Sequence, residues 1–147
     1  MSNPADRNLA LINDLYDAYR RGDLVWLQRH TASDIVLEVA GSSRISGLYR
    51  GMGASLAFGA SAEFQFVPGT LVVEEISGDD DHVRTITRIG VRGLGLAERE
   101  MRIFQEYRFD EQGRIAGVRF AAEDQDAFDG WIGRDRPRRS PSPPPPT

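Results

Sequence analysis

From Met101 to Phe109 the sequence alternates between apolar and charged residues with few exceptions. Successive side chains of a β-strand point to opposite faces of a sheet. One face therefore carries Met101, Ile103, Gln105, Tyr107 and Phe109, and the other carries Glu98, Glu100, Arg102, Glu106 and Arg108. A long strand that is apolar on one face predicts a sheet with a core on that side and solvent on the other.

Four segments of the second half of the chain have the composition of strands: Glu63 to Ile76, Val83 to Leu94, Leu96 to Phe109 and Arg114 to Glu123. Clusters of glycine and aspartate separate them, which predicts an antiparallel meander. With the turn centred on Gly93-Leu94-Gly95, Arg88 is expected opposite Glu100, Thr87 opposite Met101 and Val83 opposite Gln105.

The first half of the chain is predicted to be mainly helical. Asn3 as cap, Pro4 in the first turn and Asp6 start a helix that ends at Gly22. Asp23 caps a shorter helix that reaches His30. The remaining predictions are a strand at Ile35 to Ala40, a loose helix at Met52 to Phe58 within the Gly-, Ser- and Ala-rich segment 41–62, and a last helix capped by Asp124 or Asp126.

These elements predict one α+β domain, residues 1–133, with a curved antiparallel sheet wrapped by the N-terminal helices around one apolar pocket. A chain of 147 residues with 40% hydrophobic residues is sufficient for one such core. Residues 134–147 are rich in Pro, Arg and Ser and are expected to form a disordered tail.

Composition argues against several classes of function. A net charge of -4 makes a nucleic-acid partner unexpected, and no apolar run is long enough for a membrane span. The chain has no cysteine, two histidines and no lysine, so thiolate, histidine-rich metal and Schiff-base sites are excluded. We expect no cofactor and no metal. The N-terminus lacks the pattern of a signal peptide, so a cytoplasmic location is expected.

Three segments of the sequence resemble a known family. The segments Leu15 to Leu24, Asp34 to Val39 and Glu106 to Ile115 resemble the nuclear transport factor two-like superfamily, and within it the SnoaL-like polyketide cyclases and the ketosteroid isomerases. The resemblance covers Leu9 to about Trp131. It implies a cone-shaped sheet around one pocket for an apolar small molecule.

The resemblance also implies roles for individual residues. Ketosteroid isomerases have a general-base aspartate where this chain has Val39, and an oxyanion-hole acid where it has Gln105. Their helix tyrosine aligns one residue from Tyr16. SnoaL-like cyclases use an acid near the end of the last strand, which corresponds to Asp124. Two alternatives stand beside these roles: Asp124 as a helix N-cap, and Gln105 as a buried amide bonded to a backbone carbonyl or to Tyr107.

Two hypotheses of function follow. The first is a small cofactor-independent SnoaL-like enzyme with proton-transfer chemistry of the cyclase, isomerase or hydrolase type. In it, Asp124 moves a proton while Gln105 and Tyr16 hold an oxygen of an apolar carbonyl-containing or polyketide-like substrate. The second is a non-catalytic ligand-binding or accessory protein with the same pocket. The expected pocket residues are Tyr19, Leu37, Val39, Phe58, Thr87, Met101, Ile103, Tyr107 and Phe120.

The charged sheet face suggests a further partner. Ile86 and Phe104 lie among its charged residues, so this outer face predicts a homodimer contact. A protein-interaction module that uses the same face is the third class of function that the sequence leaves open.

Overall fold

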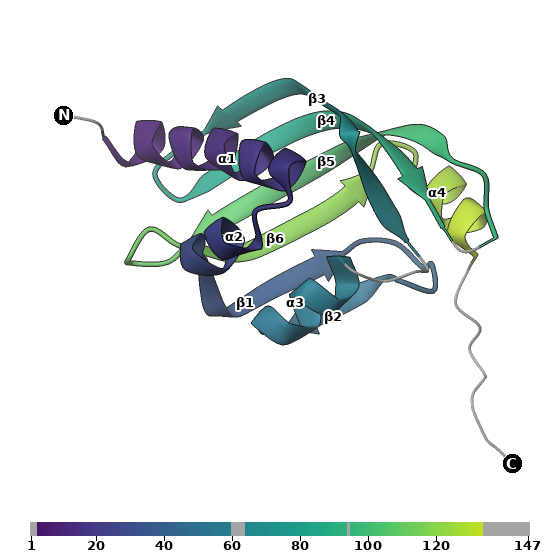
Figure 1. Ribbon diagram of the computed structural model, residues 1–147, viewed down its shortest axis with the longest axis horizontal. Coiled ribbons are helices and arrows are strands. Elements are labelled where there is room, and N and C mark those ends of the chain that lie inside the picture. The colour runs from purple at the N-terminus through teal and green to yellow at the C-terminus, as the bar shows by residue number, and fades with distance from the viewer. Residues whose placement is uncertain (1–2, 60–63, 94, 134–147) are drawn as a thin grey trace, which may run out of the picture.

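The computed structural model describes residues 3–59, 64–93 and 95–133 (Figure 1). The predicted tail 134–147, the strand start at Glu63 and the turn residue Leu94 lie outside the described residues. Along the chain, the elements are α1 (Pro4–Arg21), α2 (Leu24–His30), β1 (Thr31–Val39), β2 (Gly47–Arg50), α3 (Met52–Gly59), β3 (Gln65–Gly78), β4 (His82–Arg92), β5 (Arg99–Phe109), β6 (Ile115–Ala122) and α4 (Gln125–Ile132).

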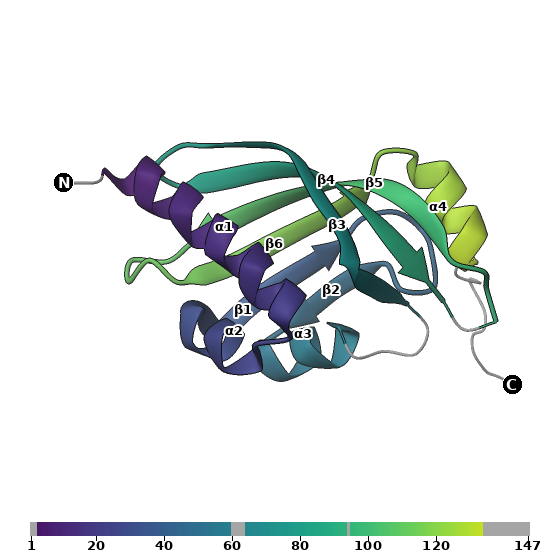
Figure 2. The ribbon, with the colours of Figure 1, turned by 45° about the horizontal axis from the view of Figure 1, so that its top comes forward.

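The six described strands form one sheet in the order β2-β1-β6-β5-β4-β3. Neighbouring strands are antiparallel, except that β1 runs parallel to β6. The sheet curls around α1, while α2 and α3 lie beside β1 and β2. Helix α4 lies at the end of the sheet opposite to the start of α1 (Figures 1 and 2). The predicted α+β fold, with a curved antiparallel sheet covered by the N-terminal helices, is confirmed.

The helix ends follow from the capping residues that the sequence indicated. The Asp6 backbone N–H donates to Asn3 Oδ1 at 2.8 Å, which satisfies one of the free donors of the first turn. Gly22 ends α1 with a φ of 68°, a left-handed conformation that glycine adopts without a Cβ clash. Asp23 then caps α2 by accepting from the Trp26 N–H at 3.0 Å.

The register of β4 and β5 differs from the prediction by two residues. Thr87 pairs with Ile103, Val83 pairs with Tyr107, and Arg88 faces Arg102. The chain does turn at the predicted place, since the Leu96 N–H donates to the Gly93 carbonyl at 3.0 Å. The predicted register is wrong because β4 ends at Arg92, β5 begins only at Arg99, and their pairing is centred one residue later. A shift of two residues keeps every side chain on its face, so the inner and outer faces remain as predicted.

The segment 41–62 contains a strand that the sequence analysis did not predict. Strand β2 is four residues long and pairs with β1, which itself begins at Thr31 instead of Ile35. So short a strand, surrounded by glycines and serines, has no alternating pattern from which it could be predicted. Helix α3 lies where the loose helix was predicted, and it packs on β1 and β2.

An aromatic cluster closes the end of the sheet next to α4. Phe64 lies 5.5 Å from Phe128 and 6.1 Å from Phe120 between ring centroids, and Phe66 lies 5.5 Å from Phe120. Phe64, Phe120 and Phe128 are all at most 2% exposed. This cluster packs between α4 and the sheet. The apolar cavity lies on the other side of it, toward α1, α2 and α3. A separate hollow of about 170 Å³ lies beside α4 and is lined by Met101, Asp124 and Phe128 among others.

Candidate functional site

The cavity lies between the concave face of the sheet and helices α1, α2 and α3. It has a volume of about 200 Å³, and its walls are mainly apolar. Five of the predicted site residues line it: Tyr16, Tyr19, Thr87, Gln105 and Tyr107. They come from α1 and from β4 and β5, two neighbouring strands of the sheet, and α1 lies on the concave side of that sheet (Figure 2).

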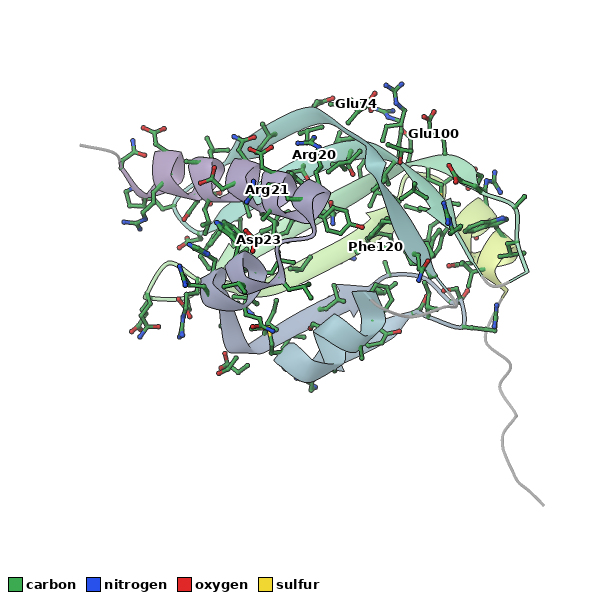
Figure 3. All side chains as sticks on the ribbon, viewed as in Figure 1. Arg20, Arg21, Asp23, Glu74, Glu100 and Phe120 are labelled. Carbon is green, nitrogen blue, oxygen red and sulfur yellow. The ribbon has the colours of Figure 1, made fainter. Side chains whose placement is uncertain are left out.

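The other predicted pocket residues, which come from β1, α3, β5 and β6, belong to the core or pack against it but do not line the cavity. Val39, Ile103 and Phe120 are fully buried in the core, at most 2% exposed. Leu37, Phe58 and Met101 are half-buried and pack against that core. One of these core residues, Phe120, is labelled in Figure 3. It lies well away from Glu74 and Glu100, two charged residues near the upper edge of the view. Strand parity predicts the face of a residue correctly, but it does not predict how far along the strand the cavity extends.

Several residues that line the cavity were missed. They include Leu15, Leu27, Ile35, Phe66, Leu71 and Ile89. Leu15 widens the apolar face of α1, and Ile89 shares the parity of Thr87, so these two could have been found from periodicity. Leu27 depends on how α2 packs, which no local pattern in the sequence indicates.

A buried hydrogen-bonded cluster forms the polar part of the cavity wall. Tyr16 Oη lies 2.7 Å from Thr85 Oγ1 and 3.0 Å from Tyr107 Oη, and it donates to Gln105 Oε1 at 2.9 Å. The Tyr16 and Tyr107 rings meet edge to face, with centroids 6.3 Å apart. The partner of the Gln105 amide is therefore Tyr16, and not Tyr107 or a backbone carbonyl.

The tyrosines of the cavity are neutral at physiological pH. Burial raises the pKa of Tyr16, although hydrogen bonds with Thr85 and Tyr107 act in the opposite direction. Burial also raises the pKa of Tyr107 well above its usual value and that of Tyr19 to about 12. These hydroxyls can donate and accept hydrogen bonds, but they are poor candidates for a general base.

Asp124 does not share this cavity. Its Oδ1 accepts from the Ala127 N–H at 3.0 Å, so Asp124 is the N-cap of α4, and its side chain is exposed. The alternative that assigned Asp124 a capping role is confirmed, and its predicted placement at the mouth of the Gln105 cavity is contradicted. The physical reason is that β6 ends at Ala122, beyond the aromatic cluster that separates α4 from the cavity.

Among the described residues, the cavity wall contains no carboxylate and no imidazole. The same part of the chain contains no group of three His, Cys, Asp or Glu side chains that could hold a metal ion. None of its helices combines the length and the apolar character needed to cross a membrane. The chemistry that the wall offers a ligand is therefore apolar contact and neutral hydrogen bonding.

Solved structures of other proteins share this fold. An NTF2-like protein from Burkholderia xenovorans LB400 is 18% identical, with a TM-score of 0.70 over 88% of this chain and 98% of that one. An LEH-like epoxide hydrolase from M. tuberculosis is 17% identical, with a TM-score of 0.64 over 88% of this chain and 92% of that one. A computationally designed 17-OHP binder is 22% identical, with a TM-score of 0.62 over 81% of this chain and 92% of that one.

At the level of sequence the chain has no such match. No protein-family model matches it, and no curated protein does. Identities this low establish the fold alone. The chain has the nuclear transport factor two-like fold that the three sequence segments suggested.

Proposed function

We propose that this protein binds an apolar small molecule in the cavity between α1, α2, α3 and the sheet. The observation that carries the proposal is a cavity whose wall is apolar except for one hydrogen-bonded cluster around Tyr16 and Gln105. Pockets for small molecules typically combine an apolar lining with a few polar groups that fix the orientation of the ligand. A carbonyl-containing compound fits this lining.

The comparisons support the proposal without deciding between binding and catalysis. One protein of this fold is a designed 17-OHP binder, and another is an LEH-like epoxide hydrolase. Binding is the better-supported function for this chain, because the described wall contains no group that could move a proton at neutral pH. The role in proton transfer that the sequence suggested for Asp124 is not part of this proposal.

Filling the cavity tests the proposal. Val118 lines the cavity on β6, so Val118→Phe should occupy the ligand space. We expect it to weaken binding of an apolar probe such as indane or 1-indanone by roughly tenfold or more, as measured by calorimetry or ligand-observed NMR. Val72→Phe is the matched control, because Val72 is 43% exposed and does not line the cavity. Equal affinity in both variants would contradict the proposed site.

A second candidate is an enzyme of the cyclase or isomerase type. The observation in its favour is the Gln105 amide, which can donate a hydrogen bond to an oxygen on which negative charge develops. The test is turnover of a carbonyl-containing substrate by the wild type and by Gln105→Met. A loss of turnover at unchanged substrate affinity would support catalysis, because an oxyanion donor acts mainly in the transition state.

A further inference from the structure

We infer that Gln105 makes the cavity selective for ligands that present a hydrogen-bond acceptor, such as a carbonyl oxygen, over ligands that present a donor. This inference rests on the proposed binding function, because it concerns the same cavity. Its basis is the distribution of protons among Tyr16, Thr85, Tyr107 and the Gln105 amide.

The observed distances account for every hydroxyl proton of the cluster. A hydroxyl group has one proton to donate and can accept two hydrogen bonds. Gln105 Oε1 can only accept, so Tyr16 donates its proton to it at 2.9 Å. Thr85 Oγ1 at 2.7 Å and Tyr107 Oη at 3.0 Å then both donate to Tyr16 Oη. No buried hydroxyl proton is left without an acceptor.

Turning the amide over would break this arrangement. Gln105 Nε2 would then donate to Tyr16 Oη, which could accept from only one of the two other hydroxyls. The remaining hydroxyl, on Thr85 or Tyr107, would have no acceptor among the described residues, and these residues are 2% and 3% exposed. The penalty for an unsatisfied buried group favours the observed orientation by roughly 5- to 100-fold.

The observed orientation leaves the amide nitrogen for the ligand. Gln105 Nε2 makes no hydrogen bond within the described part of the chain, whereas the side chain lines the cavity. The nitrogen is also accessible. In that part of the chain, the buried polar side-chain atoms without a hydrogen-bond partner are Ser55 Oγ and Arg88 Nε, and Gln105 Nε2 is not one of them. A carbonyl oxygen can accept from this N–H group, and a ligand N–H would meet a second donor. Donation by Tyr107 and Tyr16 further polarises the amide.

Three bicyclic probes of similar shape test the inference: indane, 1-indanone and indole. The first has no hydrogen-bonding group, the second has an acceptor, and the third has a donor. For the wild type we expect 1-indanone to bind roughly 3- to 10-fold more tightly than indane, and indole to bind no more tightly than indane. In Gln105→Met the advantage of 1-indanone should disappear while indane still binds.

Two variants that each remove one hydroxyl of the cluster separate an effect on the orientation of the Gln105 amide from an effect on the stability of the fold. Tyr16→Phe removes the donor that holds Gln105 Oε1, so the amide can turn and the ratio of 1-indanone to indole affinity should fall severalfold. Thr85→Val removes one donor to Tyr16 but leaves the bond from Tyr16 to Gln105, so the ratio should persist. Both variants should melt at lower temperature than the wild type, so melting temperature alone does not distinguish the two roles.

The outcomes separate this inference from the proposed function. Failure of all three probes to bind the wild type would contradict the proposed function, and the inference with it. Binding of all three with equal affinity, tightest binding of indole, or an unchanged ratio in Tyr16→Phe would overturn the inference alone. Loss of the 1-indanone preference in Tyr16→Phe and Gln105→Met, with retention in Thr85→Val, would support it.

Discussion

Tyr16 on α1 and Gln105 on β5 lie 89 residues apart in the chain and are joined by a hydrogen bond of 2.9 Å inside the core. The bond ties the N-terminal helix to the middle of the sheet at the wall of the cavity. Thr85 and Tyr107 complete the cluster through the same hydroxyl. One oxygen atom, Tyr16 Oη, therefore joins the core contacts of Thr85 and Tyr107 to the amide that we propose as the ligand-binding group.

Removal of that hydroxyl should destabilise the fold. Tyr16→Phe leaves Thr85 and Tyr107 without their shared acceptor, so we expect the free energy of unfolding to fall by roughly 1–3 kcal/mol. Urea denaturation measures it. Tyr19→Phe is the matched control: within the described chain burial acts on the Tyr19 hydroxyl and no hydrogen bond does, so a change within about 0.5 kcal/mol is expected. Equal losses in the two variants would argue against the cluster.

Stability should fall at alkaline pH. Burial raises the pKa of Tyr16, Tyr19 and Tyr107 in the folded chain, while in the unfolded chain it is about 10. Above pH 10 the unfolded chain loses tyrosine protons that the folded chain retains, so the free energy of unfolding decreases as pH rises. For Tyr19 the loss should extend from about pH 10 to about 12. Denaturation curves at pH 8 to 11.5 measure it, and Tyr19→Phe should reduce the slope.

Asp124 should act on stability and not on binding. Asp124→Ala removes the N-cap of α4, so we expect the free energy of unfolding to fall by about 1 kcal/mol. Asp124→Asn keeps a capping oxygen and should remain close to the wild type. Probe affinity should be the same in all three proteins, because the side chain lies outside the cavity. A drop in probe affinity or turnover in Asp124→Asn would restore the acid/base role.

The outer face of the sheet is expected to form a homodimer contact. Phe104 is 39% exposed there, next to the ion pair between Arg84 and Glu106 at 2.8 Å. Phe104→Glu should convert a dimer to a monomer in analytical ultracentrifugation, because it places a charge in an apolar contact. Val25→Glu, at a 62% exposed position on α2, is the control and should leave the mass unchanged. A monomeric wild type at high micromolar concentration would contradict this expectation.

The sequence carried enough information for most of the fold. The alternation around Gln105 assigned the inner and outer faces of β5, and Asn3, Gly22 and Asp23 marked the ends of the first two helices. The register of β4 and β5 was wrong because it depends on the length of their connection, which composition does not encode. Strand β2 was missed because four residues between glycines and serines give no periodic signal.

The site was harder to predict than the fold. Tyr16 and Gln105 were found because a resemblance and strand parity both indicated them, but their hydrogen bond to each other depends on the packing of α1 against the sheet. Asp124 had two consistent interpretations, since an acid after a strand and before a helix suits a cap as well as a catalytic group. Only the position of α4 relative to the cavity separates the two.

We propose that the cavity holds an apolar ligand whose hydrogen-bond acceptor is bound by Gln105. A crystal structure of the protein with 1-indanone would reveal this contact at the level of atoms. We expect the ring system among Leu71, Ile89 and Ile115, with the carbonyl oxygen at hydrogen-bond distance from Gln105 Nε2, roughly 2.7–3.2 Å. Electron density for the ligand outside this cavity, or a carbonyl oxygen turned away from Gln105, would contradict it.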